Sequence, residues 1–250
     1  KRESPLMLGI ADEMKFIGSD FNSFIDFTKD SIIIDDGEYA LLTKDGYIVK
    51  NSVTGEEAPK TITKIEWDGE TSKKGGYPHY MLKEIYEQPQ TVNNALDVEE
   101  AALDEVADMI LQGGPAYLVG VGTTFYVAEF GKYMFSTLAG ELLPAISSDE
   151  FISLTRMSKG GMVLAISQSG ETYDTLSALK HAKACGMKTA AIVNVMGSSI
   201  VRFVDKAILQ GSGPEICVIS TKAALSQMVI LTMIALRLGL KKKIISKSDF

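Results

Sequence analysis

The sequence predicts an α/β protein: a doubly wound, five-stranded parallel sheet preceded by a smaller stretch of antiparallel β structure. Two observations support this prediction. From about residue 107 onward, short apolar runs alternate with helical segments, which is the pattern of a parallel sheet whose crossovers are helices. Before residue 67, short β-prone runs are separated by Asp-Gly pairs, which are typical of antiparallel hairpins.

Composition and charge restrict the class of protein. The chain has 250 residues, of which 46% are hydrophobic and 23% are charged, as expected for a soluble globular protein with one large or two modest domains. Its net charge of −7 disfavours binding to nucleic acid or to an anionic membrane surface. The longest apolar stretch, residues 228–236, is too short to span a bilayer, so we expect a buried helix there and no membrane contact.

Cysteine and histidine are scarce. Cys185 and Cys217 fit neither a metal-binding spacing nor a disulfide framework, which favours a reducing, cytoplasmic setting. The two histidines, His79 and His181, leave little material for a metal site or a Ser-His-Asp triad. We therefore expect neither a metal ion nor a cofactor.

Residues 1–67 are predicted to form the first domain from short strands. The pairs Asp36-Gly37 and Asp45-Gly46 each lie between β-prone runs and are strong hairpin signals. The expected strands cover residues 5–11, 14–17, 31–34, 38–43, 47–50 and 62–67. The segment carries no glycine-rich loop and no acid–base cluster, and so few strands make an incomplete core. It is therefore expected to be part of a larger domain.

A polar linker rich in Gly, Ser, Lys and Glu is predicted over residues 68–78, before a second region at 79–250. That region opens with a helix over residues 80–87, which we expect Pro89 to punctuate. A second helix is predicted from Asp97, as its N-cap, to Leu111.

Strands and helices then alternate. The expected strands cover residues 117–121, 142–146, 162–166, 189–193 and 207–209. The expected helices cover residues 125–138, 148–151, 173–185, a short stretch after 198–199, and 222–238. Together they make the doubly wound layer, at about residues 107–246, in which ligands sit outside the C-terminal ends of the strands.

The most informative stretch, residues 167–172, reads Ser-Gln-Ser-Gly-Glu-Thr and joins a buried strand to a helix. Ser167, Ser169 and Thr172 offer hydroxyl donors, and Gly170 lets backbone N–H groups come close to an anion. A hydroxyl-rich turn at a helix N-terminus is a phosphate-binding arrangement. The turn contains no lysine or arginine, so it differs from a P-loop and suits a sugar phosphate better. The alternative is an ordinary helix cap, in which the hydroxyls satisfy the first amides.

Three further loops rich in Ser, Thr or Gly follow predicted strands, at residues 120–124, 194–199 and 213–222. Each of them could be plain strand-to-helix capping. The pair Gly120 and Gly122 is a weak dinucleotide-binding hint, because the third glycine and the acidic residue of that fingerprint are missing. Four such loops at one edge of a sheet favour a ligand site.

These motifs, taken in order, resemble glutamine–fructose-6-phosphate aminotransferase (isomerising), also called glucosamine-6-phosphate synthase. Residues 79–89, His-Tyr-Met-Leu-Lys-Glu-Ile-Tyr-Glu-Gln-Pro, resemble the helix that opens the family's isomerase half. The loops at 167–172, 194–199 and 213–223 resemble its first sugar-isomerase (SIS) module. Residues 4–67 resemble the end of its N-terminal-nucleophile glutaminase domain.

The resemblance implies a site for fructose 6-phosphate. The residues that would contact the substrate are Thr123, Thr124, Ser167, Gln168, Ser169, Thr172, the backbone of Val218, and Ser220. The hydroxyls of residues 167–172 would hold the phosphate, and Val218 and Ser220 would address the sugar. The family's active sites lie at a dimer interface, so the resemblance also implies a homodimer.

The chain departs from the family where the chemistry is carried out. The family's glutaminase uses an N-terminal cysteine, whereas this chain begins with Lys1, and neither Cys185 nor Cys217 can take that role. The family's isomerisation acids and bases come from a second SIS module and a C-terminal tail, beyond Phe250. We therefore expect no catalytic residue here, and a chain that is an internal part of a longer enzyme and inactive alone.

Two functions remain open at this point. In the first, the chain belongs to an enzyme that forms glucosamine 6-phosphate and glutamate from fructose 6-phosphate and glutamine. In the second, it is a non-catalytic SIS module whose sugar-phosphate binding regulates a partner. A helix-turn-helix segment or a basic face would favour the second function, and the sequence shows neither.

Overall fold

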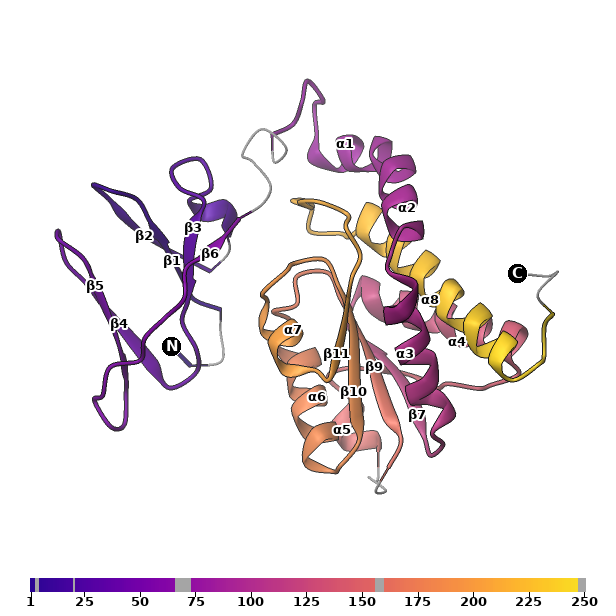
Figure 1. Cartoon of the computed structure of the whole chain (residues 1–250). Helices are drawn as coiled ribbons and strands as arrows, with labels where there is room; N and C mark the ends of the chain where they lie inside the picture. Colours follow the sequence, from indigo (N-terminus) through magenta and orange to yellow (C-terminus); the bar gives the residue numbers. More distant parts are fainter. Residues whose placement is uncertain (3–4, 20, 66–72, 156–159, 247–250) are drawn as a thin grey trace. The chain divides into compact units, whose positions relative to one another are not determined.

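The computed structural model describes residues 1–2, 5–19, 21–65, 73–155 and 160–246. The chain forms two compact units, Lys1–Gly76 and Tyr77–Phe250 (Figure 1). Antiparallel sheets in the first and a five-stranded parallel sheet in the second confirm the predicted fold class.

The first unit holds two small antiparallel sheets. Its strands are β1 (Met7–Ile10), β2 (Lys15–Gly18), β3 (Asp30–Ile33), β4 (Glu38–Leu42), β5 (Tyr47–Asn51) and β6 (Thr63–Lys64), with a 3-10 turn at Phe21–Ser23. One sheet has the order β2-β1-β3-β6, and β4 pairs with β5 in the other. Leu8, Ile32, Ile34 and Val49 are buried together, so the two sheets share one apolar core.

One of the two predicted hairpins is present. Asp45 and Gly46 lie between the antiparallel strands β4 and β5, as predicted. The prediction for Asp36-Gly37 was wrong, because β3 and β4 on either side of it belong to different sheets. Lys60 Nζ lies 2.6 Å from Asp35 Oδ2 and 2.6 Å from Glu38 Oε2, so a distant cation closes this turn instead of a strand ladder. The predicted strand over residues 62–67 is reduced to β6, and Trp67 lies outside the described residues.

The second unit contains all the described α-helices. Its elements are α1 (Tyr80–Tyr86), α2 (Gln88–Leu96), α3 (Glu100–Leu111), β7 (Ala116–Gly120), α4 (Thr123–Ala139), β8 (Ala145–Ser147), α5 (Phe151–Leu154), β9 (Met162–Ser167), α6 (Tyr173–Ala184), β10 (Lys188–Val193), α7 (Ser199–Phe203), β11 (Lys206–Leu209) and α8 (Lys222–Lys241). The strand order is β11-β10-β9-β7-β8, and every neighbouring pair is parallel.

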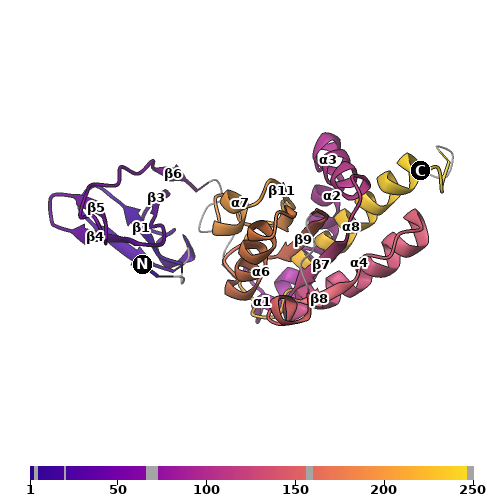
Figure 2. The same cartoon turned by 90° about the horizontal axis from the view of Figure 1, so that it is seen from below.

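Helices cover both faces of this sheet, as Figures 1 and 2 show. Side chains alternate along a strand, so Leu164 and Ile166 of β9 join one apolar cluster while Val163 and Ala165 join the other. The first cluster is completed by α3, α4 and α8, and the second by α5, α6 and α7. All six residues of β9 are buried, as expected for a central strand covered on both faces.

The long helix α8 is a core helix of this unit. It is long and apolar enough to cross a membrane by composition, but 61% of its most apolar window is buried inside the protein. It packs against α4 so closely that a Cβ at Gly239 would lie 2.1 Å from the carbonyl oxygen of Leu138. The buried helix predicted around residues 228–236 is therefore confirmed, and a glycine is required where the two helices meet.

Helix α2 was not predicted from the sequence. Pro89 was predicted to end the preceding helix, but it is the second residue of α2, where the N–H that proline lacks needs no partner. Asp97 was predicted as the N-cap of the following helix and is instead the C-cap of α2; α3 begins at Glu100. A proline in the first turn begins a helix here rather than interrupting one.

The remaining predicted elements are present with shifted boundaries. Strand β8 begins at Ala145 rather than at residue 142, because Pro144 has no N–H to contribute to a ladder. The short helix predicted over residues 148–151 begins only at Phe151. These shifts leave the order of strands and helices unchanged.

Asp205 fastens the start of β10 to the turn before β11. Its Oδ2 accepts hydrogen bonds from the backbone N–H and the hydroxyl of Thr189, at 2.8 and 3.0 Å, and Lys183 Nζ lies 2.9 Å from Oδ1. Burial raises the pKa of Asp205, but the hydrogen bonds from Lys183 and Thr189 lower it by more, so the pKa lies below its ordinary value.

We predict that the stabilising contribution of Asp205 is lost in acid. Because its pKa is lower in the folded state, its stabilising contribution is present above the unfolded-state pKa, near 4, and is lost as the pH falls through the folded-state pKa. Urea unfolding of the parent and of Asp205→Asn should therefore show a steeper acid loss for the parent. Equal slopes below about pH 4 would contradict this assignment.

Removing the Phe135 ring should test the core between α4 and α8. Phe135 is fully buried, so Phe135→Ala should lower the free energy of unfolding by about 3–5 kcal/mol. Tyr133 lies on the same helix with 63% of its surface exposed, and Tyr133→Ala should change it by less than about 0.5 kcal/mol. Urea unfolding followed by far-ultraviolet circular dichroism reports this unit, since it holds the described α-helices. Similar losses in the two variants would contradict the packing described.

Candidate functional site

The sheet changes winding direction between β7 and β9. The chain leaves β7 toward β8 on one side and then returns to place β9, β10 and β11 on the other side. The helices that follow β7 and β9 therefore lie on opposite faces: α4 packs in one apolar cluster and α6 in the other. In doubly wound sheets, ligands bind in the crevice outside the C-terminal ends of two such strands.

The turn after β9, residues 167–172, is closed by its own hydroxyl groups. Ser167 Oγ accepts a hydrogen bond from Gly170 N–H at 3.0 Å and lies 3.1 Å from Thr172 Oγ1. Ser169 Oγ accepts from Glu171 N–H at 3.1 Å. Ser167 is buried, whereas Ser169 and Thr172 are half-buried. The structure therefore brings these three predicted site residues together at the start of α6, while the carbonyl of Gln168 accepts from Asn194 N–H in the loop after β10.

Gly170 is needed in this turn for two reasons. Its φ is +67°, which lies in the left-handed region that favours glycine. A Cβ at this position would lie 2.0 Å from Ser198 Oγ and 2.6 Å from Ser198 Cβ. The β9 turn thus packs directly on the loop before α7, and Ile200 N–H donates to Gly170 O at 2.9 Å.

The first amides of α6 are available to an anion, unlike those of α7 and α8. Thr172, the N-cap of α6, makes no side-chain hydrogen bond to the helix, because its hydroxyl faces Ser167 and Ser169. At α7, the carboxylate of Glu171 accepts from Ser199 N–H at 2.7 Å. A carboxylate there neutralises the partial positive charge that a helix N-terminus would offer a phosphate. The hydroxyls of residues 167–172 accept from the turn amides of Gly170 and Glu171 and not from the first amides of α6.

The turn after β7 places Thr123 and Thr124 at the first two positions of α4. Thr124 is buried, and its hydroxyl both accepts from Val121 N–H, at 3.0 Å, and donates to Val121 O, at 2.9 Å. This hydroxyl mainly closes its own turn. Thr123 is half-buried at the N-terminus of α4, which follows β7, the strand that pairs with β9.

Asn194 connects the β9 turn to the loop before α8, residues 210–221, hereafter the α8 loop. Its backbone N–H donates to Gln168 O at 3.2 Å. Its side chain donates to Gly213 O at 2.7 Å and accepts from Ser212 N–H at 2.9 Å. One amide side chain thus fixes two of the predicted ligand loops to each other. Asn194 was predicted to lie in a loop, and no role was predicted for it.

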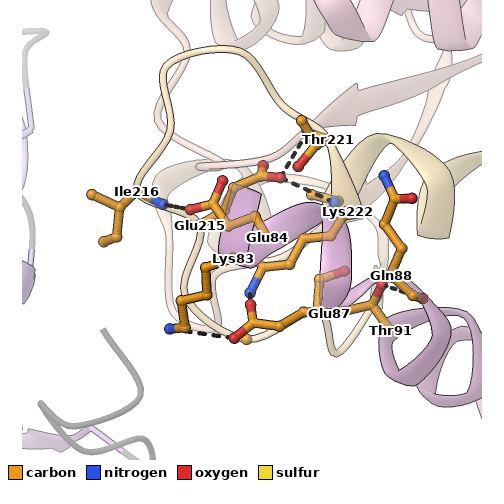
Figure 3. Close-up of polar contacts among 12 residues, drawn as sticks. Lys83, Glu84, Glu87, Gln88, Thr91, Glu215, Ile216, Thr221 and Lys222 are labelled. Carbon is orange, nitrogen blue, oxygen red and sulfur yellow. Dashed lines mark hydrogen bonds and ion pairs between the residues drawn. The ribbon is translucent and has the colours of Figure 1, made fainter. Parts of the chain in front are cut away.

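The α8 loop is organised around Glu215 (Figure 3). Glu215 Oε1 accepts from the backbone N–H groups of Thr221, at 2.9 Å, and Ala223, at 3.2 Å, so a carboxylate occupies the N-terminus of α8. Ser220 Oγ donates to Glu215 Oε2 at 2.7 Å, so this predicted sugar ligand retains only its acceptor capacity. Val218, the other predicted sugar contact, is fully exposed.

Two observations limit the chemistry of the site. Within the parts of the chain that the structure describes, no three His, Cys, Asp or Glu side chains are placed to hold a metal ion. Cys185 and Cys217 are both free thiols, and Cys185 is the C-cap of α6, outside the ligand loops. The site consists of neutral hydroxyls, backbone amides and carboxylates that are already engaged.

Comparison with known proteins places this fold in a family. A sequence model of the SIS domain matches residues 109–237, more than half of the chain, and the chain therefore belongs to the SIS domain family. It is similar to glutamine–fructose-6-phosphate aminotransferase (isomerising) from two archaea. The Thermococcus kodakarensis protein is 42% identical over 241 residues, covering 96% of this chain and 40% of the relative. The Methanococcus maripaludis protein is 38% identical over 250 residues, covering 99% of this chain and 41% of the relative.

Solved structures agree with this relationship. The C-terminal domain of the Francisella tularensis glucosamine-fructose-6-phosphate aminotransferase has a TM-score of 0.64 and 32% identity, covering 70% of this chain and 52% of that chain. An Escherichia coli protein in complex with A5P has a TM-score of 0.57 at 18% identity, which shows the shared fold alone. The resemblance inferred from the motifs is confirmed: the chain is an SIS protein related to this aminotransferase, and it spans about two-fifths of the length of those two archaeal relatives.

We predict that Gly170→Ala damages the β9 turn. The left-handed backbone alone should cost about 1–2 kcal/mol, and the clash with Ser198 adds to it. Gly186 also has a positive φ, +75°, but a Cβ there would meet nothing, so Gly186→Ala should pay the conformational cost only. Thermal unfolding compares the two variants. A loss for Gly170→Ala no larger than that for Gly186→Ala would contradict the close packing described.

Proposed function

We propose that this chain binds fructose 6-phosphate at the crevice between β7 and β9, with the phosphate on the turn of residues 167–172. The observation that carries the proposal is the N-terminus of α6, which lies at the switch point and is surrounded by hydroxyls. Its first amides donate to no side-chain oxygen, although Asp174 lies in its first turn. An anion there would receive hydrogen bonds from Ser167, Ser169 and Thr172 and from backbone amides. Since the chain has a net charge of −7, these local donors must supply the attraction.

In this proposal the sugar extends toward the other predicted ligands. Thr123 and Thr124 border the crevice at the start of α4, and Gln168 lies within the β9 turn itself. The backbone of Val218, together with Ser220 as an acceptor, would contact the sugar hydroxyls from the α8 loop. The proposed binding site, or grip, thus has two parts. The phosphate end is the turn after β9, and the sugar end is the α8 loop.

We further propose that the chain is part of an enzyme that forms glucosamine 6-phosphate and glutamate from fructose 6-phosphate and glutamine. The similarity to the aminotransferases supports this, because it extends over 96% of the chain and so includes most of the antiparallel unit. A regulatory SIS module, the alternative function, does not account for that unit. The chain would hold and orient the sugar phosphate, while the proton transfers would fall to groups outside these 250 residues. Assembly as a homodimer belongs to the same proposal.

Calorimetric titration with fructose 6-phosphate tests the site. Ser169→Ala removes one hydroxyl from the anion and should weaken binding by about 10- to 100-fold, because a hydrogen bond to a charged group contributes about 1.5–3 kcal/mol. Ser136→Ala makes the same change on the exposed side of α4 and should bind like the parent. Fructose without the phosphate should bind far more weakly to all three proteins. Equal affinities of the parent and Ser169→Ala for fructose 6-phosphate would overturn the phosphate assignment.

A further inference from the structure

Glu84 makes a long-range contact that the proposed sugar site does not itself explain. It lies on α1, its residue surface is only 2% exposed, and its Oε1 accepts hydrogen bonds from two successive backbone N–H groups of the α8 loop. The distances are 2.6 Å to Ile216 N and 3.0 Å to Cys217 N. Figure 3 shows Glu84 reaching from α1 to Ile216 of this loop, which lies 132 residues later in the chain.

Stability alone does not account for this carboxylate. Burying an ionised group is costly unless all its acceptor sites are used. Glu84 Oε2 is buried and makes no hydrogen bond with any of the described residues. Burying a carboxylate with one unsatisfied oxygen costs stability. Its two hydrogen bonds to backbone amides, however, fix the local geometry of the α8 loop. The contact therefore points to a requirement for one particular path of the loop.

The path that Glu84 sets leads directly into Val218. Fixing the amides of Ile216 and Cys217 fixes the direction in which the backbone reaches the next residue, and the Val218 side chain is fully exposed. On the other side of the tip, Glu215 holds Ser220 and Thr221. The exposed tip is thus held between two carboxylates, one from its own loop and one from α1.

A second contact keeps α1 in place against α8. Lys222, the first residue of α8, is 3% exposed, and its Nζ lies 2.6 Å from Glu87 Oε2. Lys83 Nζ lies 3.3 Å from the other oxygen of Glu87. Glu84 and Glu87 are three residues apart, so one side of the α1 segment makes both contacts (Figure 3). A contact to the first residue of α8 therefore also helps to fix the position of Glu84.

From this geometry we infer that Glu84 is a positioning residue for sugar recognition: from α1, it holds the α8 loop so that the backbone of Val218 is presented to the sugar part of the ligand. The inference rests on the proposed function. Without Glu84 the loop samples other paths, and the apparent affinity falls in proportion to the fraction of molecules with the competent path. If that fraction fell to about a tenth, the apparent Kd for fructose 6-phosphate would rise about tenfold. The phosphate end, on the β9 turn, is not changed.

Two substitutions separate positioning from simple structural damage. Glu84→Gln keeps an oxygen that can accept from both amides, and it should bind fructose 6-phosphate within about threefold of the parent, as a neutral acceptor is somewhat weaker. Glu84→Leu removes the acceptor and should weaken binding by about tenfold or more. Hydrogen exchange at the amides of Ile216 and Cys217 should be faster in Glu84→Leu than in the parent. Glu105→Leu, which removes a half-exposed glutamate on α3, is the matched control and should leave binding and exchange unchanged.

Inorganic phosphate is the second probe, because it uses only the phosphate end. Its affinity should be the same for the parent and Glu84→Leu. Equal losses for phosphate and fructose 6-phosphate, or unchanged loop exchange in Glu84→Leu, would overturn the inference. If the parent binds no fructose 6-phosphate, the proposed function fails, while the exchange measurement still tests whether Glu84 holds the loop. Should Glu84→Leu not fold by circular dichroism, Glu84→Ala, which admits water to the two amides, is judged by the same criteria.

Discussion

The parallel register of β9 between β7 and β10 is the constraint on which the rest of the site depends. Because β7 and β9 are neighbours, the turns that follow them open at the same edge of the sheet. Because α4 and α6 then pack on opposite faces, those turns lead away in opposite directions, which is the arrangement at which doubly wound sheets bind ligands. The apolar side chains of β9 face both clusters and hold this register. The burial of β9 therefore both forms the core and positions the turn that follows it.

The chemistry of the crevice is decided by which groups satisfy the helix N-termini. Carboxylates occupy two of them: Glu171 at α7 and Glu215 at α8. At α6, neutral hydroxyls surround the turn, and their hydrogen bonds run within it rather than to the helix. Among these three ends, α6 is therefore the one whose first amides donate to no side-chain oxygen, although Asp174 lies in its first turn. An acidic protein can accommodate an anion in this way, since short-range donors act where the overall charge would repel.

Local sequence was enough to predict the parts of this protein that depend on neighbouring residues. The β9 turn was predicted because strand, hydroxyls, glycine and helix follow one another within residues 162–185. The hairpin at Asp45-Gly46 was predicted for the same reason. Pro89 was misinterpreted because proline is common both just after the end of a helix and in the first turn of a helix. Only the packing of α2 on α8 decides between these two positions. Asp36-Gly37 was misinterpreted because Lys60, a distant residue, sets that turn.

The residues that organise the sugar end were beyond prediction for a related physical reason. Asn194 and Glu215 lie in the quoted motifs, but their roles depend on contacts between loops that follow different strands. Glu84 gives no local signal, because a glutamate on a short helix is ordinarily solvated and its partners are more than a hundred residues away. Hydroxyl-rich turns could therefore be recognised from the sequence, whereas the buried carboxylates that hold them could not.

The two ends of the proposed grip differ in how firmly the fold determines them. The phosphate end is part of a strand-to-helix connection whose geometry follows from a fully buried strand, and Gly170 and Ser198 fit it tightly against the next loop. The sugar end is the α8 loop, whose tip at Val218 is exposed and whose path depends on Glu84, Glu215 and Asn194. Side-chain contacts to a loop can be altered without disturbing the sheet. In the proposed grip, the phosphate end can thus stay the same while the loop, and the residues that hold it, determine which sugar fits.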